Sequence, residues 1–129
     1  MKQLLTALSV LLVLAACQSS AQKEPVRNIL GEWDSHEAFD GKPWHFLARF
    51  KTDGTFDGLG NGKLIVSGSY RTNGDTIFFK DALCNLDYEA SYRLTYFKDS
   101  IRFNLITDTC QQRIAGSDKV TLGRVQSAK

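Results

Sequence analysis

The chain has 129 residues, with 16 lysines and arginines against 14 acidic residues and a formal net charge of +2. This length predicts a single domain with one compact core. The basic residues form no block, so the charge pattern disfavours a nucleic acid as partner.

Residues 1–16 have the composition of a secretory signal peptide. One lysine, Lys2, precedes an apolar run over residues 4–14, and two alanines follow. The run is too short for a stable membrane-spanning helix. Residues 14–17, LAAC, resemble the lipobox of bacterial lipoproteins, which implies cleavage before Cys17 and lipidation of its thiol. Each buried methylene of an acyl chain adds about 0.8 kcal/mol of membrane affinity, so two or more chains would anchor the protein to a membrane.

Residues 17–28 are polar, contain one proline and show no apolar periodicity, which predicts a lipidated flexible tether. The part after the cysteine reaches about 35 to 40 Å when fully extended. Gln18 follows the cysteine at a position where an aspartate would favour retention in the inner membrane, and no acidic run follows. We therefore expect anchoring in the outer membrane, on the periplasmic side of the cell envelope.

The three cysteines leave Cys84 and Cys110 as a pair once Cys17 is lipidated. Because an exported chain matures in an oxidising compartment, we expect a disulfide between them. Closing a loop of about 26 residues stabilises a domain by roughly 3 to 4 kcal/mol in the chain-entropy model. A zinc site shared with histidine is disfavoured, since neither His36 nor His45 has zinc-site spacing from a cysteine.

From residue 29 onward, short apolar and aromatic runs alternate with turn residues, the pattern of an antiparallel all-β domain. The segments expected to form strands are 31–34, 44–51, 55–56, 64–71, 77–79, 88–96, 101–105 and 119–125. No segment of helical length shows a 3.6-residue period. Because open sheet edges invite pairing with other chains, eight short strands must close on themselves or form two sheets. We expect an up-and-down barrel over residues 29–126.

Several segments resemble the lipocalin-like, or calycin, barrels of small bacterial proteins. They are the Gly-x-Trp opening at 31–33, the hairpin segments 50–56, 68–70 and 75–77, and an Asp-x-Cys-x-x-Arg segment at 108–113. The resemblance implies that Trp33 closes one end of the barrel beneath an arginine from the last strand. Arg124 matches the position of this arginine, and Arg113 is the alternative candidate. Such a contact stabilises a fold by about 0.5 to 2 kcal/mol and is structural, not catalytic.

The aromatic residues on the inward face of the expected strands can fill an eight-stranded barrel or line a pocket at its mouth. This inward set contains Trp44, Phe46, Phe50, Phe56, Tyr70, Phe79, Tyr88, Tyr92, Tyr96 and Phe103. Leu64 and Leu105 are assigned to the same face. If a pocket forms, the expected lining is Trp44, Phe46, Tyr70, Tyr88, Tyr92 and Phe103. The tyrosines favour a partly polar interior because each buried hydroxyl needs a hydrogen-bond partner. The assignment rests on strand parity, which a one-residue bulge reverses.

Residues that could support catalysis or bind a metal ion are few. Five polar residues crowd the segment around the two tryptophans: Asp34, His36, Glu37, Asp40 and His45. Only two of them are histidines, and residues 35–42 are expected to form a solvated loop. The glycine-rich segment 58–62 precedes a strand and not a helix, unlike a phosphate-binding loop. We therefore expect no enzyme activity, no cofactor and no metal ion.

Two kinds of binding function remain. The first is an envelope protein that holds a small apolar or amphipathic molecule in the barrel mouth, and it predicts a cavity of several hundred cubic ångströms. The second is a protein-interaction module of the envelope, comparable to the small barrel lipoproteins that inhibit lysozyme, and it predicts a filled core. We favour the first because no loop carries residues that mark an inhibitory contact.

Overall fold

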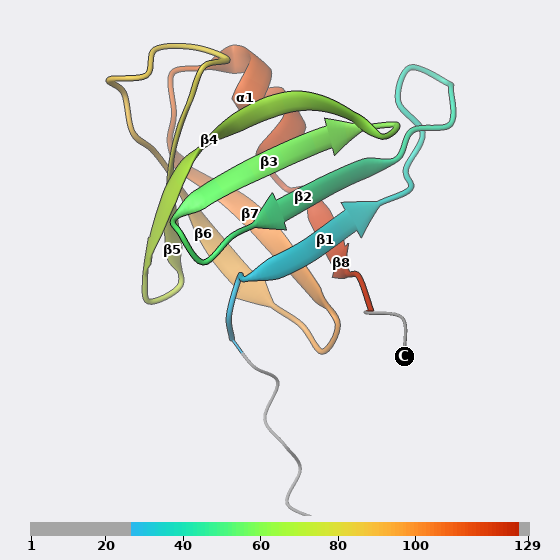
Figure 1. Ribbon diagram of the computed structural model, residues 1–129, viewed down its shortest axis with the longest axis horizontal. Helices are drawn as coiled ribbons and strands as arrows, with labels where there is room; N and C mark the ends of the chain where they lie inside the picture. Colours follow the sequence, from blue (N-terminus) through green and yellow to red (C-terminus); the bar gives the residue numbers. More distant parts are fainter. Residues whose placement is uncertain (1–26, 127–129) are drawn as a thin grey trace, which may run out of the picture.

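The computed structural model describes residues 27–126 of the chain. The expected signal peptide and the lipidation site Cys17 lie outside this range. Within it, eight antiparallel strands pair in chain order and the last returns to the first, which closes a barrel (Figure 1). The expected eight-stranded up-and-down barrel is confirmed. None of the described residues forms a helix long and apolar enough to cross a membrane.

Each strand overlaps one of the segments expected from the sequence. The strands are β1 (Gly31–Ser35), β2 (Phe46–Phe50), β3 (Thr55–Gly60), β4 (Lys63–Asn73), β5 (Thr76–Asp81), β6 (Ala90–Tyr96), β7 (Ser100–Thr107) and β8 (Thr121–Arg124). Their inward positions alternate with outward ones, as the period of two requires. Apolar side chains at the inward positions form one continuous core.

One helix, α1 (Gln111–Ser117), was not expected and lies between β7 and β8. It has only seven residues, too few for the 3.6-residue period to emerge from the sequence. Its buried side chain is a charged one, Arg113, so the usual apolar stripe of a surface helix is missing.

Two register shifts interrupt the strand pairing, and one of them changes which apolar side chain points inward. Between β3 and β4, Ile65 has no partner, so Ile65 reaches the edge of the interior while Leu64 is 61% exposed. Between β6 and β7, Ile106 has no partner, but Leu105 lies before the shift, pairs with Tyr92 and keeps the parity of Phe103, although it is partly exposed. The inward assignment of Leu64 was therefore wrong, because an extra residue in one strand inverts the parity beyond it.

Trp33 and Arg124 cover one end of the barrel, which we call the closed end. The Arg124 guanidinium carbon lies 4.0 Å from the centroid of the Trp33 ring. Arg124 also donates hydrogen bonds to the carbonyl oxygens of Leu30, at 3.1 Å, and Asn28, at 2.7 Å. The Trp33 indole N–H donates to the carbonyl oxygen of Ile29. Of the two arginines considered for the contact with Trp33, Arg124 makes it and Arg113 does not.

The opposite end, called the open end, carries the β1–β2 loop, the β5–β6 loop and α1 (Figure 1). The described chain starts at the closed end. Between the two ends lies an aromatic layer in which Phe79 contacts Phe56, at a centroid distance of 5.3 Å, and Phe103, at 6.2 Å. Side chains fill the barrel below this layer, where Ile77 and Ile101 are fully buried.

Candidate functional site

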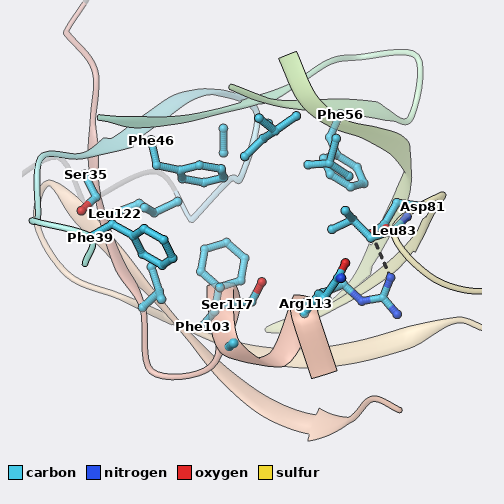
Figure 2. Close-up of a pocket in the computed structure, with 18 of the residues that line it drawn as sticks. Ser35, Phe39, Phe46, Phe56, Asp81, Leu83, Phe103, Arg113, Ser117 and Leu122 are labelled. Atoms are coloured by element: carbon cyan, nitrogen blue, oxygen red, sulfur yellow. Dashed lines mark hydrogen bonds and ion pairs between the residues drawn. The ribbon is translucent and has the colours of Figure 1, made fainter. Parts of the chain in front are cut away.

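A cavity of about 430 Å³ occupies the open half of the barrel. Its wall is mainly apolar and comes from the inner faces of the strands, from α1 and from the β1–β2 loop. Figure 2 shows Phe46, Phe56, Phe103 and Leu122 around this space, with Phe39 of the β1–β2 loop at one side. The barrel is thus filled at one end and hollow at the other.

The inner face of β3 carries glycines where other strands carry large side chains, and side chains of the cavity wall pack on them. A Cβ atom on Gly60 would collide with the Trp44 ring, and one on Gly58 would lie 2.6 Å from a methyl carbon of Val66. Trp44 therefore packs directly on the backbone of β3. Phe39 lies against Trp44, with ring centroids 5.8 Å apart, and is 68% exposed at the rim.

Three of the six residues expected to line a pocket do so: Trp44, Phe46 and Phe103. The three tyrosines pack in or against the core and are not part of the cavity lining. Tyr70 lies deeper in the barrel, and its hydroxyl donates to the carbonyl oxygen of Lys51 in the β2–β3 turn, at 2.7 Å. Tyr88 lies outside β6, which begins at Ala90, so the alternation of that strand does not apply to it. Tyr92 is fully buried, and its hydroxyl faces a carboxylate instead of the cavity.

A buried ionic network stands at the cavity wall. Arg113, whose side chain is 4% exposed, donates to Asp81 at 2.9 Å and makes two hydrogen bonds with Asp108 at 2.7 and 2.9 Å. Figure 2 shows the pair of Arg113 and Asp81 at one side of the cavity. The Tyr92 hydroxyl donates to the same Asp108 oxygen that accepts from the Arg113 Nε, at 2.6 Å. The network is therefore one connected set that joins α1 to β5 and β6.

The ionisation of this network is fixed by its internal hydrogen bonds. Burial opposes the charged form of Asp108, but hydrogen bonds from Arg113, Tyr92 and the Cys110 N–H hold the pKa of Asp108 below its ordinary value. Burial, followed by the hydrogen bond to Asp108, raises the pKa of Tyr92. Burial alone would lower the pKa of Arg113, but its carboxylate partners raise it. At neutral pH, the cavity wall thus presents a permanently charged group among apolar ones.

The disulfide between Cys84 and Cys110 is formed, as expected, and spans 26 residues of sequence. It connects the β5–β6 loop to the residue before α1, with a Cα–Cα distance of 5.8 Å. Together with the ionic network, it fixes α1 in place at the open end.

Of the five polar residues that crowd the segment around the tryptophans, three lie together at the base of the β1–β2 loop. The Nε2 atoms of His36 and His45 each lie 3.1 Å from the same carboxylate oxygen, Oδ2 of Asp34. Glu37 and Asp40 are exposed and lie outside this group. Sequence proximity suggested the crowding, but the convergence on one oxygen requires the pairing of β1 with β2.

Comparisons with protein-family models, with curated proteins and with solved structures found no match. The resemblance to lipocalin-like barrels therefore stays a prediction from the sequence segments that carry it. The functional argument depends on the barrel and on the geometry of its open end.

Proposed function

We propose that this chain is a lipid-anchored protein of the cell envelope whose barrel binds a small apolar or amphipathic molecule. The cavity is the observation that supports this proposal. Its volume of about 430 Å³ lies within the range of about 300 to 1,000 Å³ of small-molecule sites, and such sites are mostly apolar with a few polar groups. A protein-interaction module with a filled barrel is less favoured because half of the barrel is hollow.

The distribution of polar groups supports an amphipathic ligand. Arg113 and Asp81 lie together on one side of the cavity, whereas Phe46, Phe103 and Leu122 border the remaining space (Figure 2). The guanidinium makes three hydrogen bonds to its two carboxylates, so this polar set has a fixed position at the cavity wall. A molecule with an apolar body and one polar group fits this arrangement.

The position of the chain start fits an anchored binding protein. The described chain starts at the closed end, opposite the open end that holds the cavity (Figure 1). If the chain is held at a membrane through Cys17, the mouth is accessible from the aqueous side.

Native mass spectrometry on the mature chain tests the proposal. The chain carries Cys17→Ser, is exported behind a signal peptide that is cleaved without lipidation, and is purified without detergent. We expect a reproducible additional mass of a few hundred daltons, which identifies the ligand class. A bare protein mass in every preparation would contradict the proposal and favour the protein-interaction alternative.

A variant that fills the cavity tests where the ligand binds. Ala48 lies on the cavity wall in β2, so Ala48→Leu places additional carbons in the cavity, whereas Leu47→Phe adds carbons outside, at the neighbouring position. The probe is anilinonaphthalene sulfonate, which combines apolar rings with one anionic group. We expect Ala48→Leu to bind it at least about tenfold more weakly, because small volume changes in an apolar pocket have effects of this size. Leu47→Phe should bind it as the unchanged protein does.

A further inference from the structure

Both histidines of the chain lie in one cluster with a carboxylate, at the base of the β1–β2 loop. The imidazole rings are stacked, with centroids 4.3 Å apart and an interplanar angle of 11°. Their Nε2 atoms and a carboxylate oxygen of Asp34 all lie within 4.8 Å of one another. This set of atoms, two imidazole nitrogens and one carboxylate oxygen, is a ligand set of zinc and related metal ions.

Two of the three separations are close to those of metal ligands. Bonds from Zn²⁺ to histidine nitrogen and carboxylate oxygen are about 2.0 to 2.2 Å long, so neighbouring ligand atoms in a tetrahedral site are about 3.3 to 3.6 Å apart. Each Nε2 lies 3.1 Å from the Asp34 oxygen, close to this spacing. An ion among the three atoms would replace the hydrogen bonds that the two Nε2 atoms make with the carboxylate.

Strand pairing holds two of the three ligands in place. Asp34 belongs to β1, and His45 directly precedes β2, whose first residue pairs with Ser35. The backbone N–H of His45 also donates to the side-chain oxygen of Asn61, at 2.9 Å, which fixes its position. The third ligand, His36, has a side chain that is 72% exposed, so its ring is able to rotate to complete the coordination. Its exposure also leaves room for a water molecule as fourth ligand.

We propose that Asp34, His36 and His45 bind a divalent transition-metal ion of the zinc type. The ion links the end of β1 to the start of β2 and thereby fixes both ends of the β1–β2 loop. This loop carries Phe39 and Trp44 at the rim of the cavity. Metal binding therefore orders the mouth of the barrel, whatever molecule the cavity holds.

The test is a titration of the mature Cys17→Ser chain, without a histidine tag, with Zn²⁺ at neutral pH. Because the chain has only two histidines, its imidazole NMR spectrum contains two sets of ring signals. We expect both sets to shift together and to saturate at one zinc ion per chain, with equilibrium dialysis giving the same stoichiometry. Mg²⁺, which prefers oxygen ligands, should shift neither set.

Variants separate this site from adventitious zinc binding. His36→Ala changes an exposed side chain and should leave the thermal transition in place, whereas Asp34→Asn removes the charged ligand. Loss of an outer-shell partner alone weakens metal sites by about 10- to 100-fold, so each variant should bind zinc at least about tenfold more weakly. Asp40→Asn, on the same loop but outside the cluster, should bind zinc unchanged. The proposal is overturned if only one ring responds, if Mg²⁺ gives the same response, or if His36→Ala binds zinc as tightly as the unchanged chain.

Discussion

Replacing Arg113 with leucine should destabilise the fold severely, because its two carboxylate partners remain buried without a counter-charge. The side chains of Asp81 and Asp108 are 1% and 0% exposed. Removing one partner from a buried ion pair costs about 3 to 5 kcal/mol. The free energy of unfolding of a typical domain is only about 5 to 15 kcal/mol, so the variant should lose a large part of it.

The loss should depend on pH in a defined direction. In the unchanged protein, the pKa of Asp108 is held below its ordinary value, so its contribution to stability is present above about pH 4 and is lost below it. Without Arg113, burial dominates and raises the pKa of Asp108 above its ordinary value. The difference in the free energy of unfolding between the variant and the unchanged protein should therefore be largest at neutral pH. It should become smaller as the pH falls toward about 4.

Urea unfolding followed by tryptophan fluorescence measures both effects, with the free energy of unfolding obtained by linear extrapolation. Arg102→Leu is the matched control, since Arg102 is exposed on β7, and it should change stability by no more than about 0.5 kcal/mol. Replacing Arg113, Asp81 and Asp108 together with leucine should restore part of the loss, because no buried charge is left unpaired. The reasoning would be refuted if Arg113→Leu lowered the free energy of unfolding by less than about 1 kcal/mol at neutral pH. It would also be refuted if the variant lost the same free energy at neutral pH and at about pH 4.

Three further predictions concern the same fold. Replacing Cys84 and Cys110 with serine should lower the free energy of unfolding by about 3 to 4 kcal/mol, as measured by urea unfolding against the oxidised protein. Equal urea midpoints for the two proteins would contradict this prediction. Gly68→Ala should lower the melting temperature, because its Cβ collides with the backbone of β5, whereas Gly116→Ala in α1 meets open space and should stabilise by about 0.5 to 1 kcal/mol. Because the pKa of Tyr92 is raised, its contribution to stability is complete below about pH 10 and is lost as the pH rises further. The urea midpoint of Tyr92→Phe should therefore fall less steeply with rising alkaline pH than the midpoint of the unchanged protein.

The sequence was sufficient to predict the barrel because most strands have clean alternation over four or more residues. In β6, Tyr92, Leu94 and Tyr96 all point inward as their spacing requires. The errors occur where the local pattern is interrupted. The unpaired residue Ile65 leaves no mark in the apolar pattern, since Leu64 and Val66 beside it could equally have been the extra residue.

The candidate site was less predictable because it depends on contacts between distant segments. Arg113 and Asp81 are 32 residues apart, and nothing near either residue indicates the other. The Asp-x-Cys-x-x-Arg segment contains both Asp108 and Arg113, but its resemblance suggested a family and not an ion pair. The hollow half of the barrel was also open to two interpretations, since the same aromatic residues could have filled it.

The composition of the open end bears on the kind of ligand that we propose for it. An ion pair buried in a wall is weak evidence for stability, because well-packed apolar residues of similar volume often hold a fold equally well or better. The disulfide already fastens α1 to the β5–β6 loop, so α1 does not need Arg113 as its only attachment. A charged group retained at this position provides what leucine could not, namely a fixed polar contact beside an apolar space. This reasoning supports an amphipathic ligand over a wholly apolar one, and it predicts that the cavity binds a long-chain alcohol more tightly than the alkane of equal length.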